Sequence, residues 1–68
     1  MVRVESEAMT EVEYDPASAV LAIRFTDGDW YSYSGVPAAV HQDFLRADSH
    51  GRFFQEHIRG HYRYRKGR

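Results

Sequence analysis

The last twenty residues combine arginine with tyrosine in a pattern that suits contact with a nucleic-acid strand. Four arginines in this segment could bind phosphate, because a guanidinium group matches the geometry of phosphate oxygens. Tyrosines in the same segment and in one earlier segment offer rings on which single-stranded bases stack, each worth about 1–3 kcal/mol. The candidate nucleic-acid-binding residues are Arg52, Arg59, Arg63, Arg65, Tyr31, Tyr33, Tyr62 and Tyr64.

These residues have a second interpretation that the sequence leaves open. Residues 49–68 carry six basic and one acidic side chain, whereas residues 1–48 carry three basic and nine acidic ones. The arginines could therefore pair with the acidic first part of the chain. Tyr31 and Tyr33 could pack beneath helices or pair across a hairpin. The arginines and tyrosines would also suit a protein-interaction or self-association surface.

Other chemistry-bearing residues form no recognisable catalytic or metal site. His57 and His61 are four residues apart, but Gly60 between them is expected to end a helix, and no third ligand is evident. Residues 48–50 are an aspartate, a serine and a histidine, the three residue types of a hydrolase triad. They cannot form a triad, because the side chains of consecutive residues cannot converge on one proton path. We therefore expect a binding module that has no catalytic residue, metal or cofactor, and not an enzyme.

Length and composition predict one small domain that spans residues 1–68. The chain has no cysteine, which excludes disulfides and thiolate metal sites and gives no sign of an oxidising compartment. Residues 1–9 are too polar for a signal peptide, and no apolar run is long enough to span a membrane. We expect a cytoplasmic protein with no membrane partner.

Alternating side chains predict three antiparallel strands at residues 9–14, 19–26 and 30–34, and a short edge strand is expected at 2–4. Leu21, Ile23 and Phe25 are the expected core residues of the second strand. A tight type I′ turn is predicted at Asp27-Gly28. The face that carries Tyr31 and Tyr33 depends on the register across this turn, since a slip of one residue reverses it.

Helical periodicity follows the strands. A first helix is predicted over residues 37–47, and a second begins near Ser49, the expected N-cap, and ends at Gly60. Arg52 and Arg59 are seven residues apart, so we expect them on one helical face. Beyond Gly60 the period changes to two, which turns the tyrosines towards the protein and the arginines towards water. The predicted fold is α+β, a three-stranded antiparallel meander with two short helices packed on one face and an extended basic C-terminal segment.

Several short motifs together resemble the KTSC domain, a module named for its occurrence at the C-terminus of some lysyl-tRNA synthetases and also seen as a free-standing bacterial protein. The resemblance covers residues 10–65 and implies an accessory domain, with RNA binding suggested by the synthetase association. If all four arginines bound RNA, log affinity would fall against log salt with a slope of roughly −3. The matching motifs are YDP at 14–16, YSY at 31–33, GVP at 35–37, ADS at 47–49, GRFF at 51–54, HIRG at 57–60 and YRY at 62–64.

Overall fold

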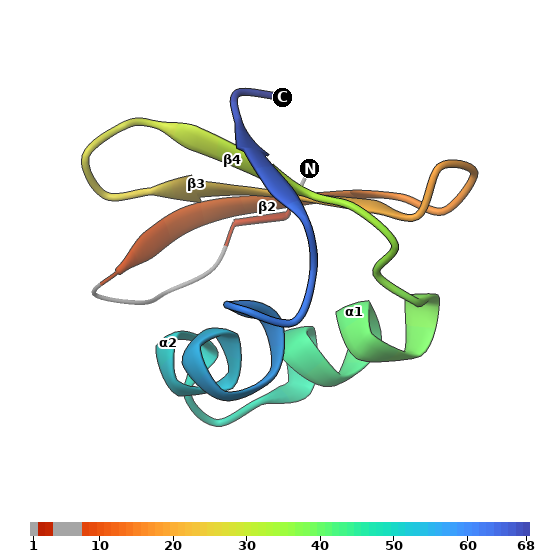
Figure 1. Ribbon diagram of the computed structural model, residues 1–68. Helices are drawn as coiled ribbons and strands as arrows, with labels where there is room; N and C mark the ends of the chain where they lie inside the picture. The colour runs from red at the N-terminus through yellow and green to blue at the C-terminus, as the bar shows by residue number, and fades with distance from the viewer. Residues whose placement is uncertain (1, 4–7) are drawn as a thin grey trace.

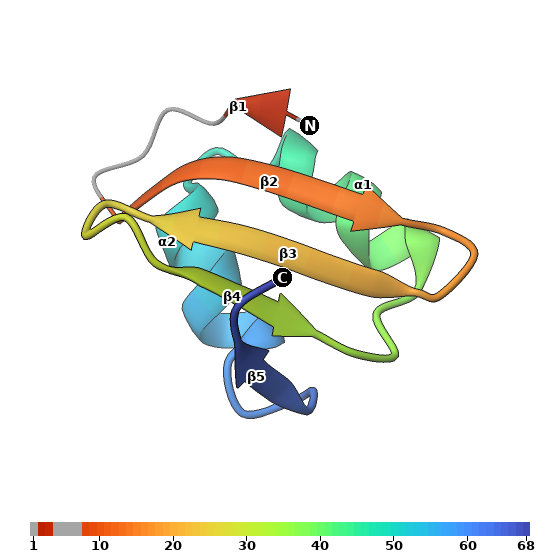
Figure 2. The ribbon, with the colours of Figure 1, turned by 90° about the horizontal axis from the view of Figure 1, so that it is seen from above.

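An antiparallel sheet forms one layer of the domain, and a pair of helices covers one face of it (Figure 1). The computed structural model describes residues 2–3, by their backbone, and residues 8–68. Seen from above, the strands follow one another across the sheet in chain order (Figure 2). The predicted α+β meander is thus confirmed, with a short strand at each of its edges: the expected one near the N-terminus and a second one formed by the C-terminal segment. The strands are β1 (Val2–Arg3), β2 (Met9–Asp15), β3 (Val20–Phe25), β4 (Trp30–Tyr33) and β5 (Tyr64–Lys66).

The core lies between the inner face of the sheet and the helices. Leu21 and Ile23 are fully buried there, as predicted, and Phe25 packs against them at the margin of the core. The predicted edge strand is confirmed by the pairing of β1 with β2 at residues 2 and 3, while Val4 lies outside the described residues. The fully buried side chains with the largest volumes are Phe44, Met9, Leu21, Ile23, Ile58, Val12 and Val36.

The hairpin between β3 and β4 has a longer loop than its sequence predicts. Phe25 donates its backbone N–H to the carbonyl of Asp29 and accepts from Gly28, both at 2.9 Å, so three residues form the loop. Gly28 alone in this loop has a positive φ, of 94°, whereas a type I′ turn needs two such residues. The prediction of a type I′ turn is therefore wrong, and the prediction of a hairpin is right. The third loop residue shifts the pairing by one and decides which face β4 presents.

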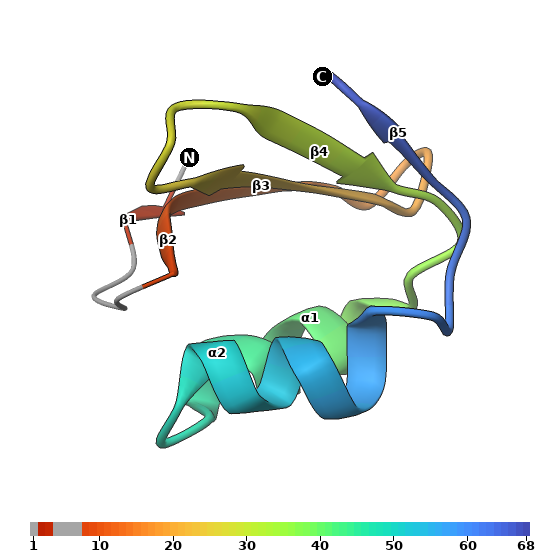
Figure 3. The same cartoon turned by 60° about the vertical axis from the view of Figure 1, so that its left-hand side comes forward.

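The two helical segments lie side by side beneath the sheet (Figure 3). The first is α1 (Ala38–Arg46); the second begins as α2 (His50–Phe53) and continues as a π-helical turn, η1 (Phe54–Ile58). The predicted N-cap is confirmed, because the Ser49 hydroxyl accepts a 3.1 Å hydrogen bond from the Arg52 backbone N–H. Gly60 has a φ of 80°, which is the left-handed conformation expected where the second helix ends.

The C-terminal segment leaves the helix layer and pairs with β4 as the strand β5 (Figure 3). Its last residues reach the outer face of the sheet, which the helices do not cover (Figure 2). There the Arg68 guanidinium lies 4.3 Å from the centroid of the Trp30 ring and pairs with Glu13. Lys66 Nζ lies 3.2 Å from Asp29 Oδ2. The basic segment is therefore tied to acidic residues of the hairpins. In the part of the chain that the structure describes, no helix is long and apolar enough to cross a membrane.

We expect Gly60→Ala to destabilise the protein by about 1–2 kcal/mol, the usual cost of a left-handed backbone for a residue with a Cβ. Apart from its chain neighbours, no atom lies within 4 Å of the added Cβ, so the cost comes from the backbone and not from a clash. Gly60→Asn is the matched control, because asparagine tolerates this conformation. Urea unfolding measures both variants. Equal loss in the two would contradict the backbone explanation.

His41 is expected to make the domain sensitive to acid. Its ring stacks on Tyr14 with centroids 4.4 Å apart, and its buried Nε2 has no hydrogen-bond partner among the described residues. Burial lowers the pKa of His41 below its usual 6.5, so the unfolded chain binds a proton more readily than the folded one. The free energy of unfolding should therefore decrease as the pH falls below about 6.5.

Urea unfolding at a series of pH values tests this. His41→Gln should flatten the decrease, and His61→Gln, a change at an exposed histidine, should leave it intact. An unchanged acid dependence in His41→Gln would show that another group is responsible.

Candidate nucleic-acid interface

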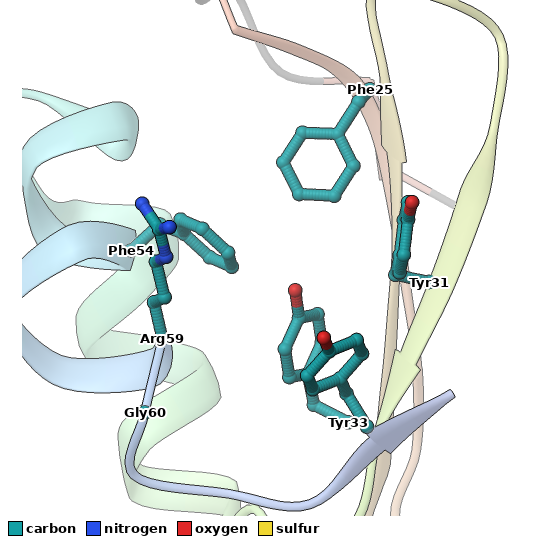
Figure 4. Close-up of a pocket in the computed structure, with 7 residues that line it drawn as sticks. Phe25, Tyr31, Tyr33, Phe54, Arg59 and Gly60 are labelled. Atoms are coloured by element: carbon teal, nitrogen blue, oxygen red, sulfur yellow. The ribbon is translucent and has the colours of Figure 1, made fainter. Parts of the chain in front are cut away.

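Five aromatic rings surround a cavity of about 300 Å³ between the sheet and the second helix (Figure 4). Each ring contacts two others of the set, and the neighbouring centroids are 5.4 to 6.0 Å apart, so the five close a circuit. The circuit includes residues from three strands and from η1. We call it the aromatic cage; it consists of Phe25, Tyr31, Tyr33, Phe54 and Tyr64.

Strand register brings the cage together. Tyr33 pairs with Leu21 and Tyr31 pairs with Ile23, so both tyrosines share the inner face with two core residues. On its other side Tyr33 pairs with Tyr64, which places the β5 ring on the same face. Phe54 completes the circuit from the helix layer. The inner face of the sheet therefore holds all three cage tyrosines.

Arg59 lies at this cavity on the helix side, opposite Tyr31 (Figure 4). The π turn positions it, because the Arg59 backbone N–H donates a 2.8 Å bond to the carbonyl of Phe54, five residues earlier. Its guanidinium donates a 3.1 Å hydrogen bond to Gln55 Oε1, and the residue stays exposed. A positive charge is thus held beside the rings.

The surroundings of Tyr33 keep its phenol group neutral. Burial, together with the neighbouring Tyr64 and Tyr31, raises the pKa of Tyr33 to about 12. The hydroxyl groups of Tyr31, Tyr33 and Tyr64 make no hydrogen bond to another of the described residues. The Tyr14 hydroxyl, by contrast, donates to the Val36 carbonyl at 2.7 Å. The cage hydroxyls are available to a bound molecule.

Of the predicted binding residues, the structure brings together Arg59, Tyr31, Tyr33 and Tyr64. These four differ in access: Tyr64 is 64% exposed and Tyr31 is half-buried, whereas Tyr33 is 5% exposed. The inner-face packing of Tyr31 and Tyr33 is the second interpretation that the sequence left open. A base can reach the rings of Tyr64 and Tyr31, while the ring of Tyr33 is covered.

The other predicted residues lie elsewhere. Arg52 lies at a separate concavity near Ser49, with its Nε 4.0 Å from Glu56 Oε1. The π turn explains why Arg52 and Arg59 do not share a face, since seven residues no longer make two turns of an α-helix. Arg65 pairs with Ser32 and lines a concavity on the outer face of the sheet.

Arg63 and Tyr62 come just before β5 and do not line the cage. Arg63 is exposed, and its carbonyl accepts a 2.9 Å bond from the Ser34 backbone N–H. Tyr62 packs against the core as predicted, at the margin of a different concavity near Val40. The four arginines therefore do not form one patch.

Phe25 and Phe54 are the site residues that the sequence did not indicate. Each lies in a segment with a clear apolar face, and that pattern predicts core packing only. Both do pack in the core, and each also contributes a ring to the cage. Only the register of the sheet reveals the second role.

We expect Tyr33 to destabilise the protein at alkaline pH. Because its pKa is raised to about 12, the folded chain keeps a proton that the unfolded chain loses near pH 10. The free energy of unfolding should fall as the pH rises from about 10 towards 12. Tyr33→Phe should reduce this fall, and Tyr62→Phe serves as the matched control. Urea unfolding at pH 8 and pH ~11 measures the difference; the same alkaline fall in both variants would contradict the assignment.

Comparison with known proteins agrees with the fold and the motifs. Residues 5–62 match the family model of the KTSC domain. A protein of Tsukamurella paurometabola is 51% identical over 53 residues, which cover 78% of this chain and 79% of that one. The crystal structure of a KTSC domain protein from Yersinia pestis superimposes with a TM-score of 0.92 at 40% identity, and covers 98% of this chain and 94% of that one. A lysine–tRNA ligase of Nostoc sp. is 28% identical over 64 residues, which are 94% of this chain and 11% of the ligase. This chain belongs to the KTSC domain family.

Proposed function

We propose that this chain is a non-enzymatic, cytoplasmic module that binds single-stranded RNA at the aromatic cage and Arg59. The observation that carries the proposal is the position of an arginine beside accessible tyrosine rings at one cavity. Stacking on a ring holds a base, and a guanidinium group holds the phosphate of the same strand. Tyr64 and Tyr31 supply the rings, and Arg59 supplies the charge.

The lysine–tRNA ligase of Nostoc sp. supports RNA as the nucleic acid, since its name gives tRNA as a substrate and a segment of it is similar to nearly all of this chain. A module with one cationic contact binds weakly by itself. If the module is joined to a larger RNA-binding protein, its effective concentration near the bound RNA is high. It then strengthens the RNA binding of the whole protein, although the larger protein makes no additional contacts. Such a tethered role suits the small size of the site.

Protein interaction or self-association is the second candidate, and the surface favours it less. Among the described residues, Tyr64 is the only large hydrophobic side chain that is well exposed. A stable protein interface usually has a cluster of buried apolar anchors at its centre. A single exposed tyrosine beside an arginine suits a base and its phosphate better.

A titration with an unstructured RNA oligonucleotide tests the proposed function. Because Arg52 and Arg65 lie at other concavities, log affinity should fall against log salt with a slope of about −1 and not of roughly −3. Arg59→Gln should weaken binding about fivefold, the effect of removing one exposed charged contact. Arg52→Gln, which removes one positive charge outside the cage, should bind the oligonucleotide with the same affinity as the wild-type protein.

Two results would refute the proposal. One is the absence of binding at low salt. The other is an affinity that Arg59→Gln and Arg52→Gln reduce equally, because binding would then follow net charge and not the cage.

A further inference from the structure

We infer that the aromatic cage is a subsite for a single unpaired nucleotide, with the base on the rings and its phosphate on Arg59. The inference rests on the proposed function and specifies the ligand of that site. Its basis is the size of the cavity, the sign of the charge beside it and the phenol groups that line it. Together these features favour a nucleotide over a cationic ligand or a purely apolar ring.

The geometry of the cavity suits a single base. About 300 Å³ is at the lower end of the volumes of small-molecule sites, which range over about 300–1,000 Å³. The rings of Tyr31 and Tyr64 are already neighbours, with centroids 6.0 Å apart and planes tilted by 51°. These tilted rings leave no space for a base between them, so a base stacks on the exposed ring of Tyr64 at the opening.

The charge excludes a cationic ligand. Aromatic cages recognise quaternary ammonium groups when the rings alone, or rings with carboxylates, face the cation. Here Arg59 is the charged residue at the cavity, and no carboxylate of the described residues lines it. A guanidinium group repels an ammonium ion and attracts a phosphate. The ligand should combine a flat, uncharged ring with an anionic group, as a nucleotide does.

The phenol groups favour a base over a purely apolar ring. Tyr33 lies 5% exposed within the cage, and its raised pKa of about 12 keeps its hydroxyl protonated. Together with the hydroxyls of Tyr31 and Tyr64, it can donate to or accept from the polar edge of a base. In a duplex that edge is paired and both faces of the base are stacked, so the ligand must be unpaired.

Titration of the isotope-labelled full chain with nucleoside 5′-monophosphates, followed by amide NMR shifts, tests the inference. The amides of Arg59, Gly60 and Tyr64 should shift with saturation. The indole N–H of Trp30 should not, because Trp30 lies on the outer face of the sheet beside Arg68. The same titration with the parent nucleosides measures how much the phosphate contributes to the affinity. A titration with choline shows whether the cage prefers a cation.

Variants separate the two halves of the site. Tyr64→Ala should weaken monophosphate binding about tenfold or more, and Tyr64→Phe, which keeps the ring, should restore most of the affinity. Arg59→Gln should reduce the affinity for a monophosphate to that for its nucleoside. Arg52→Gln, the charge-matched control, should change neither.

The outcomes distinguish this inference from the proposed function. If oligonucleotides bind while monophosphates leave the cage amides unshifted, the single-nucleotide subsite is wrong and RNA binding stands. If monophosphates saturate the cage but oligonucleotides do not bind, the subsite is supported and the RNA function is wrong. Tighter binding of choline than of a monophosphate would overturn the assignment of an anionic ligand.

Discussion

The register between β3 and β4 is the constraint on which the rest of the structure depends. The loop after Phe25 contains three residues, so Ile23 pairs with Tyr31 and Leu21 with Tyr33. A two-residue turn would slip the pairing by one, and every β4 side chain would change face, because side chains alternate along a strand. Trp30 would then lie in the core, and the tyrosines would face outward. One loop residue thus decides whether the cage exists.

The cage and the core share their aromatic residues. Half of the ten aromatic residues in this chain line the cage, and two of those five, Tyr33 and Phe54, are also buried core residues. A domain of 68 residues buries a small core, so few side chains are available to serve one purpose only. The site is consequently buried on its Tyr33 and Phe54 side. It is open at Tyr64, which lies exposed on a short edge strand.

The basic C-terminal part of the chain pairs in the folded domain with acidic residues of the N-terminal part. The basic C-terminal segment meets the acidic hairpins through Lys66 with Asp29 and Arg68 with Glu13. These contacts are exposed and contribute little stability individually. Strand pairing with β4 places β5 and its Tyr64 ring. The ion pairs also use cations that a nucleic acid would otherwise contact. Among the described residues, the side-chain partner of Arg59 is the neutral Gln55, so the charge of Arg59 stays available at the cage.

Local signals in the sequence were enough for the fold class, the helix cap at Ser49, the left-handed Gly60 and the core residues Leu21 and Ile23. These features depend on neighbouring residues, whose periodicity and backbone preferences are legible without a structure. The assembly of the site was not, because Tyr31 in β4 lies far along the chain from Phe54 and Arg59. Their meeting depends on the third loop residue of the β3–β4 hairpin and on the π turn before Arg59. Each is a shift of one residue in hydrogen bonding, and it is visible only in the folded domain.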